Sequence, residues 1–226
     1  MNVLFAGGGT GGHLYPGLAI ARALVRRDPA MQPHFVGARR GVERDVLPTA
    51  GFPYTLLDLH PLYRPQVWKN WRTVGGAAAA WGAMGRLARE LQPRLVVGTG
   101  GYASGVALAW AWAHRVPIVQ HIGDSHPGMT ARFFTRASRE AYLGFPEAER
   151  WLPHAGCVFR FTGNPIEPPP AFGPAPLHQC QVGRQEGHCQ PVPQCAGDGR
   201  LFVTIHRHAL ASCGGTPRGG NLAAGG

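Results

Sequence analysis

Short apolar runs alternate along the chain with segments in which apolar residues recur every three or four positions. A continuous apolar run is typical of a strand that is buried on both faces of a parallel sheet, and the longer recurrence is typical of a helix. Strands are predicted at 2–6, 34–37, 54–57, 94–98, 116–120 and 141–143. Helices are predicted at 18–25, 42–47, 67–91, 103–114 and 129–135.

This alternation predicts an α/β fold, a Rossmann-like doubly wound parallel sheet. Pro16 is expected near the first turn of the first helix, where a missing N–H costs nothing. Sheets of this kind bind their ligands at the carboxyl ends of the strands. The loops that follow the strands are therefore the places to look for chemistry.

The alternation ends near residue 168. Five prolines fall within 168–176 and predict a stiff linker, and beyond it only 201–205 resembles a strand. The closing residues are rich in glycine and offer almost no core material. We predict a domain at 1–167, a proline-rich linker at 168–176, and an irregular, largely disordered tail at 177–226.

Four of the five cysteines lie in that tail, with histidines nearby. A zinc site is one interpretation, but Cys180, Cys189 and Cys195 are separated by eight and five residues. Structural zinc sites instead use paired cysteines two residues apart. The favoured interpretation is a shifted reading frame in a GC-rich gene, and no metal or cofactor is predicted.

The formal net charge is +10 and the isoelectric point is about 10.3. Nucleic acid and anionic membrane are the usual partners of such a charge. Lys69 is the only lysine, so the arginine excess can reflect codon composition, and no aromatic RNA-binding motif is present. We expect no nucleic-acid partner. The chain opens on a strand-like segment and has no apolar window of about 18 residues, which predicts a cytoplasmic protein with free thiols and without a membrane-spanning helix.

The predicted helix at 67–91 carries an aromatic stripe. Trp68, Trp71, Val74, Ala78 and Trp81 recur at three- and four-residue steps, with basic residues interleaved. Amphipathic rings beside basic side chains suit an anionic membrane interface. The other interpretation is that the stripe packs on the sheet as ordinary core, and the pattern alone leaves both open.

A glycine-rich turn occupies 7–13, between the first strand and the first helix. Its glycines let the backbone approach a ligand closely, and the helix N-terminus offers free N–H groups to a diphosphate. Thr10 adds a hydroxyl donor, and His13 suits proton transfer near neutral pH. A dinucleotide site and a turn without ligand remain alternatives, although the spacing is not that of a dinucleotide fingerprint.

A second glycine-rich turn, at 98–105, also follows a strand and opens a helix, and a smaller Thr-Gly-Asn-Pro element stands at 162–165. Because the carboxyl ends of parallel strands meet at one edge of the sheet, we expect the two glycine loops to lie together. Two such turns in one domain favour a site for an anionic ligand.

These motifs resemble, in order and spacing, those of the MurG family of glycosyltransferases over roughly residues 1 to 170. The matching segments are Gly-Gly-Thr-Gly-Gly-His at 8–13 with Pro-Gly-Leu-Ala at 16–19, Gly-Gly-Tyr-Ala-Ser-Gly at 100–105, Pro-Gly-Met-Thr at 127–130 and Thr-Gly-Asn-Pro-Ile at 162–166. Gly37 with Gly-Val-Glu at 41–43 also fits.

The resemblance implies the N-terminal half of a two-domain GT-B enzyme with inverting, metal-free chemistry. Members of the family transfer N-acetylglucosamine from UDP-N-acetylglucosamine (UDP-GlcNAc) to the undecaprenyl-linked acceptor lipid I. The product, lipid II, serves peptidoglycan synthesis and hence cell shape and division. The N-terminal domain binds the acceptor, the C-terminal domain carries most of the donor site, and the enzyme is peripheral on the cytoplasmic face of the cell membrane.

Site residues follow from the resemblance by position. His13 is the candidate base, or else a diphosphate contact. Donor contacts are implied at Thr10, Gly11, Gly12 and Asp124. Contacts with the acceptor or its diphosphate are implied at Gly100, Gly101, Tyr102, Ser104 and Asn164.

Two positions depart from the family pattern. Asp124 stands where an asparagine is expected, and Glu167 where an arginine is expected. Asp124 would repel a diphosphate unless it were protonated or were neutralised by His121 or His126; alternatively, it caps the following helix.

The tail does not resemble a donor domain, so this chain alone is expected to be inactive. Three alternatives remain: a transferase that obtains its donor domain elsewhere, a remnant that binds acceptor or membrane, and a dinucleotide-binding module.

Overall fold

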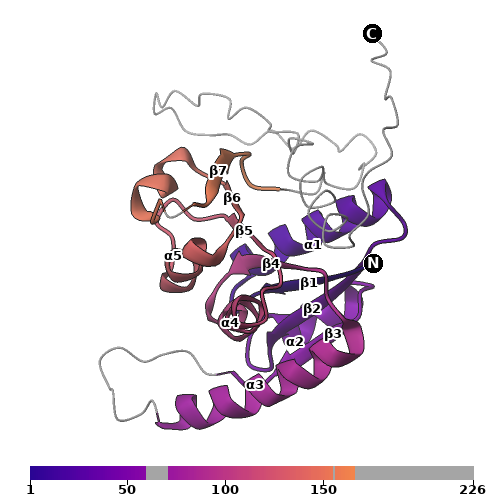
Figure 1. Cartoon of the computed structure of the whole chain (residues 1–226). Helices are drawn as coiled ribbons and strands as arrows, with labels where there is room; N and C mark the ends of the chain where they lie inside the picture. Colours follow the sequence, from indigo (N-terminus) through magenta and orange to yellow (C-terminus); the bar gives the residue numbers. More distant parts are fainter. Residues whose placement is uncertain (60–70, 155, 166–226) are drawn as a thin grey trace, which may run out of the picture.

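The computed structural model describes residues 1–59, 71–154 and 156–165. Seven parallel strands form one sheet in the order β3-β2-β1-β4-β5-β6-β7 (Figure 1). The strands are β1 (Asn2–Gly7), β2 (Gln32–Ala38), β3 (Tyr54–Leu57), β4 (Leu95–Gly100), β5 (Ile118–Ile122), β6 (Glu140–Leu143) and β7 (Val158–Phe161). The predicted Rossmann-like sheet is confirmed.

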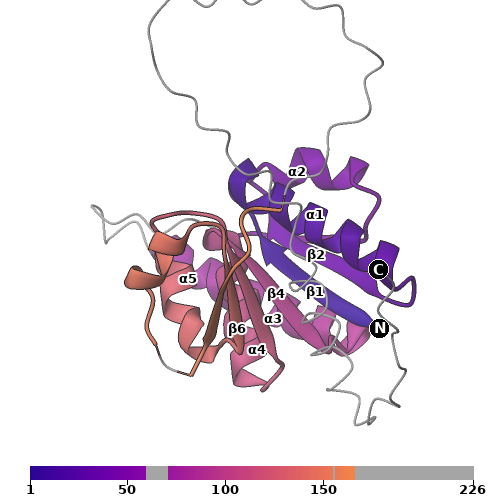
Figure 2. The same ribbon diagram turned by 90° about the horizontal axis from the view of Figure 1, so that it is seen from above.

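Helices connect the strands and cover both faces of the sheet, with α1 on one side and α3 and α4 on the other (Figure 2). The α-helices are α1 (Gly11–Arg27), α2 (Glu43–Val46), α3 (Trp71–Leu91), α4 (Gly105–Ala113) and α5 (Met129–Phe134). The 3-10 helices among the described residues are η1 (Leu47–Thr49), η3 (Tyr102–Ser104), η4 (Thr135–Ala137) and η5 (Pro146–Trp151).

The central strand β1 shows why its sequence is continuously apolar. Val3 and Phe5 pack into the core beneath α1, whereas Leu4 and Ala6 pack into the core beneath α3 and α4. All four side chains are buried, because alternate residues of a strand point to opposite faces and both faces are covered. The strand thereby fixes the position of the loop that follows it.

The first helix differs from its prediction. It begins at Gly11, directly after Thr10, so Pro16 lies inside the helix and not in its first turn. The glycines at 11 and 12 suggested loop, but only residues 8–10 separate the end of β1 from the start of the helix. Pro16 cannot donate to the carbonyl of Gly12, so one helical hydrogen bond is lost near the open N-terminal end.

The predicted strands at 2–6, 34–37, 54–57, 94–98, 116–120 and 141–143 are confirmed, and β7 was not predicted. Within the described ranges, no helix is long and apolar enough to span a membrane. The predicted linker, the tail, its strand at 201–205 and its cysteines lie outside the described residues.

Candidate functional site

The loops after β1 and β4 lie side by side at the carboxyl edge of the sheet. Strand order reverses here, since β2 and β3 lie on one side of β1 and β4 to β7 on the other. The backbone N–H of Gly8 donates to the carbonyl oxygen of Gly100 over 3.2 Å. The predicted meeting of the two glycine loops is therefore confirmed, at the position where doubly wound sheets bind ligands.

Glycine is required in the second loop by both backbone angle and space. Gly101 has a φ of +76°, and a Cβ atom there would lie 1.8 Å from the carbonyl oxygen of Gly8. Gly100 has a φ of +100°, and a Cβ atom there would lie 2.6 Å from Cδ2 of His13. Because these glycines have no side chain, the second loop packs directly against the first loop and the His13 ring.

The first glycine loop rests on a buried carboxylate. Oε1 of Glu43 accepts hydrogen bonds from the backbone N–H of Gly9, at 2.8 Å, and of Ala38, at 3.1 Å. Glu43 is fully buried, and a Cβ atom at Gly8 would lie 1.9 Å from its Oε1. The sequence placed Glu43 in a family segment but assigned it no role. The spacing of Gly37, Gly41 and Glu43 was the available signal.

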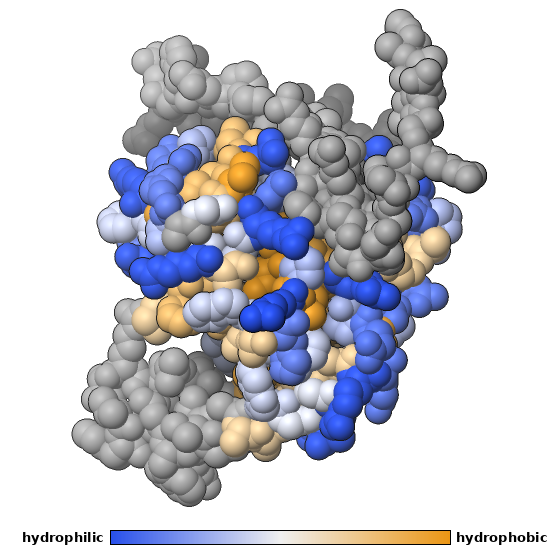
Figure 3. Space-filling view, viewed as in Figure 1, coloured by the Kyte–Doolittle hydropathy of each residue, from blue (hydrophilic) through white to orange (hydrophobic). Residues whose placement is uncertain are grey.

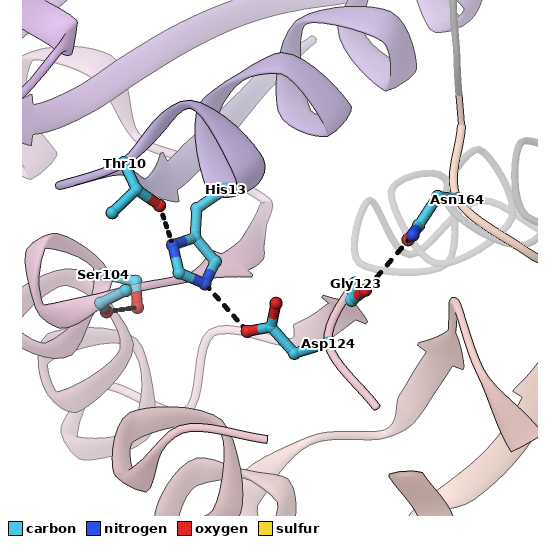
Figure 4. A network of polar contacts seen from close by, with 7 residues as sticks. Thr10, His13, Ser104, Gly123, Asp124 and Asn164 are labelled. Atoms are coloured by element: carbon cyan, nitrogen blue, oxygen red, sulfur yellow. Dashed lines mark hydrogen bonds and ion pairs between the residues drawn. The ribbon is translucent and has the colours of Figure 1, made fainter. Parts of the chain in front are cut away.

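His13 lies between two polar side chains from different loops (Figure 4). Its Nδ1 is 2.8 Å from Oγ1 of Thr10, and its Nε2 is 3.2 Å from Oδ2 of Asp124, in the loop after β5. The side chain of His13 is 20% exposed and that of Asp124 is 55% exposed. The three groups form an open polar cluster at the carboxyl edge.

For Asp124, the predicted helix cap is wrong, and His121 does not neutralise it. The residue at the start of α5 is Gly128, so Asp124 does not cap that helix. His121 is fully buried, and burial lowers its pKa to about 4, so the ring is neutral near pH 7. The ring of His126 packs on Trp151, with the centroids 4.4 Å apart. The histidine that contacts Asp124 is His13, from the other side of the switch point.

Gly11 and Gly12 form the first turn of α1 beside this cluster. Backbone N–H groups in the first turn have no partner within the helix, and they lie at its positive end. A Cβ atom at Gly12 would meet nothing within 4 Å, so its backbone is open to a ligand. The predicted donor contacts at these residues stay predictions that the geometry permits.

Tyr102 and Ser104 hold the second loop in place. The Ser104 hydroxyl is buried and donates to the carbonyl oxygen of Gly101 over 2.8 Å. The Tyr102 ring lies against the first loop, where a Cβ atom at Gly9 would be 2.6 Å from its Cε1. Both residues were predicted as acceptor contacts. The hydroxyl of Ser104 is therefore already engaged within the protein.

Asn164 lies apart from His13, beside the loop after β5 (Figure 4). Its Nδ2 donates to the carbonyl oxygen of Gly123 over 3.2 Å, while its Oδ1 is buried without a partner among the described residues. The structure therefore brings Asn164 to the segment that carries Asp124. Its predicted contact with a diphosphate stays a prediction.

Within residues 1–59, 71–154 and 156–165, no three His, Cys, Asp or Glu side chains gather in a way that could hold a metal ion. The cysteines and histidines weighed as zinc ligands, Cys180, Cys189 and Cys195 among them, lie outside those ranges, as does Glu167.

Comparison with known proteins gives a consistent result. The model of the glycosyltransferase family 28 N-terminal domain matches residues 3–143. The chain is 40% identical over 172 residues to a UDP-N-acetylglucosamine--N-acetylmuramyl-(pentapeptide) pyrophosphoryl-undecaprenol N-acetylglucosamine transferase of Moorella thermoacetica, covering 74% of this chain and 45% of that protein. It is 38% identical over 182 residues to the protein of the same name in Syntrophotalea carbinolica, covering 78% and 50%.

Among solved structures, the crystal structure of MurG from Acinetobacter baumannii matches with 26% identity and a TM-score of 0.57. The match covers 74% of this chain and 46% of that one. The chain spans about half the length of the curated relatives it matches.

Proposed function

Because the chain belongs to glycosyltransferase family 28, whose N-terminal domain it contains, we propose that it is the acceptor-side half of a hexosyltransferase. The substrates are those named by its relatives: UDP-GlcNAc as donor, and an undecaprenyl diphosphate that carries N-acetylmuramyl-pentapeptide as acceptor. The observation that carries the proposal is the position of His13, held between Thr10 and Asp124 where the two glycine loops meet.

The reaction needs a base at this edge. The acceptor hydroxyl must lose a proton as its oxygen bonds to the sugar and the bond between sugar and diphosphate breaks. His13, which is partly exposed beside the glycine loops, is the base that takes up a proton in this step. The first turn of α1, with Gly11 and Gly12, offers backbone N–H groups at the positive end of the helix to the departing diphosphate.

The second substrate is bound to a membrane, and the surface near α4 and α5 suits one. Trp112 and Phe133 are each about half exposed, and their ring centroids are 5.9 Å apart. Arg132, Arg136 and Arg150 line the adjoining groove and have no carboxylate partner among the described residues. Over the region of α5, Figure 3 shows hydrophilic and hydrophobic residues side by side. Such a surface is suited to the anionic cytoplasmic face of the cell membrane.

This surface differs in part from the aromatic stripe expected from the sequence. Trp81 of that stripe is 40% exposed, whereas Ala80 and Met84 on the same helix pack into the core. Trp68 and the side chain of Trp71 lie outside what the structure describes. In a flotation assay with phosphatidylglycerol vesicles, the variant W112A/F133A should bind at most half as much as the wild type. F161A, which removes an equally exposed ring from β7, should leave binding unchanged.

Transferase activity is tested by supplying a donor half. The 226-residue chain alone should transfer no N-acetylglucosamine to a lipid I analogue. A hybrid in which residues 1–165 are followed by the C-terminal half of the Moorella thermoacetica relative should do so. A folded hybrid without turnover would contradict the proposal, and turnover by the chain alone would show that it needs no further domain.

The second candidate is a remnant that binds acceptor or membrane without catalysis. It is favoured by Asp124, an acidic side chain at an expected donor contact. In that case the full chain would bind the lipid I analogue, but the hybrid would remain inactive. Binding of a nicotinamide cofactor by the full chain would instead support the dinucleotide-binding alternative.

A further inference from the structure

Both ring nitrogens of His13 are engaged, and their two partners are not equivalent. Asp124 faces Nε2 and Thr10 faces Nδ1. A carboxylate only accepts hydrogen bonds, whereas a hydroxyl either donates or accepts. Beside Asp124, Nε2 must therefore carry the ring proton, and in the neutral ring Nδ1 keeps its lone pair. The Thr10 hydroxyl then donates to Nδ1.

Thr10 stands at the N-cap position of α1, but its side chain does not cap the helix. It stands immediately before α1 with extended backbone angles, φ −140° and ψ 158°, where a threonine usually accepts a hydrogen bond from the first turn of the helix. No such side-chain bond is made. The hydroxyl is directed to the imidazole of His13 instead, while Thr10 itself is exposed at the carboxyl edge.

The ring is also packed from the side. A Cβ atom at Gly100 would lie 2.6 Å from Cδ2 of His13, and one at Gly101 would lie 3.2 Å from its Nδ1. These contacts, together with the bonds to Thr10 and Asp124, hold the ring in one orientation. A substrate hydroxyl therefore meets Thr10 and not a free nitrogen of His13.

We propose that Thr10 is a catalytic residue that relays the acceptor proton to Nδ1 of His13, and that Asp124 is the positioning residue that fixes the ring tautomer. The acceptor hydroxyl gives its proton to Oγ1 of Thr10 as its oxygen bonds to the sugar carbon. Thr10 gives its own hydroxyl proton to Nδ1, and the nucleoside diphosphate leaves with the electron pair of the broken bond. The imidazolium that forms faces the Asp124 carboxylate. This inference rests on the proposed transferase function.

The tautomer is tested on the full 226-residue chain, without any donor half. Long-range ¹H–¹⁵N NMR spectra should show neutral His13, assigned by the signals that vanish in H13Q, mainly as the Nε2–H form. D124N should populate both forms, because an amide both donates and accepts. T10V should keep the Nε2–H form but shift the Nδ1 signal, and T10S should return the Nδ1 signal to its wild-type position. A predominant Nδ1–H form in the wild type would overturn the proposal.

The relay is tested in the hybrid with UDP-GlcNAc and the lipid I analogue. T10V, which keeps the branched shape, should lower kcat by about 10²–10⁴-fold, the range for loss of general base catalysis, and T10S should retain most of it. Wild-type kcat in T10V would overturn the relay while leaving the transferase function standing. A hybrid with no turnover would instead contradict the proposed function, and the tautomer measured in the full chain would be unaffected.

Discussion

Replacing Glu43 by alanine should destabilise the protein through the first glycine loop. The substitution removes the acceptor of two backbone N–H groups, those of Gly9 and Ala38. It also empties space that the glutamate fills beside Gly8, Gly37 and Gly41. The loop would lose the support that places Thr10 and the start of α1.

The magnitude follows from the two hydrogen bonds. A buried donor left unpaired costs about 1–3 kcal/mol. Ala38 is fully buried and takes the upper part of that range, whereas Gly9 is only half-buried and takes the lower part because water can reach it. Oε2 of Glu43 is buried without a partner among the described residues, so removing the carboxylate relieves some desolvation. The net loss of unfolding free energy for E43A is about 2–4 kcal/mol.

Urea unfolding of the full chain, followed by far-ultraviolet circular dichroism at pH 7, measures this loss. E43Q is the matched control, because it keeps the volume and the Oε1 acceptor, and it should lose about 1 kcal/mol or less. A loss below about 1 kcal/mol in E43A, or an equal loss in both variants, would refute the hydrogen-bonding argument.

Three further predictions concern other parts of the domain. G101A should lower the unfolding free energy by about 2–4 kcal/mol, because Gly101 has a φ of +76° and an added Cβ atom would clash with the Gly8 carbonyl. In the same urea assay, G105A on α4 should be neutral or stabilising, and equal effects of the two substitutions would contradict this prediction. Because the pKa of His121 is lowered from 6.5 to about 4 in the folded protein, the unfolded chain takes up the proton first as the pH falls. Between pH 7 and pH 4, the unfolding free energy of the wild type should therefore fall by about 3 kcal/mol more than that of H121Q. Parallel profiles of unfolding free energy against pH would refute the lowered pKa of His121. Burial and the nearby Glu140 charge raise the pKa of the Cys157 thiol to about 11. Iodoacetamide at pH 8 should therefore alkylate Cys157 far more slowly than free cysteine, which mass spectrometry of the Cys157 peptide would measure. Equal alkylation rates would contradict this prediction.

The sequence predicted the sheet well because both faces of the strands are covered. Buried parallel strands such as β1 and β4 are continuous apolar runs, and these are easy to recognise. β7 was missed because it lies at the edge of the sheet, and its Val-Phe-Arg-Phe sequence is largely exposed. The start of α1 was missed because glycines count against a helix until the end of the preceding strand is known.

The sequence named the residues of this candidate site but not the contacts between them. The glycine loops and His13 follow from local spacing, which a sequence displays directly. The contact between His13 and Asp124 joins residues 111 positions apart, across the strand order of the sheet. Glu43 was given no role because its burial depends on the missing side chains of Gly8, Gly37 and Gly41. Such relations arise only when the chain is folded.

We propose above all that His13 is the base of a hexosyltransferase at the carboxyl edge of this sheet. The most direct measurement is the kcat of the hybrid enzyme for transfer from UDP-GlcNAc to the lipid I analogue, with H13Q set against H154Q, an exposed histidine beside Glu149 and far from the glycine loops in sequence. We predict that H13Q lowers kcat by about 10²–10⁴-fold and that H154Q leaves kcat unchanged. Wild-type kcat in H13Q would contradict the account.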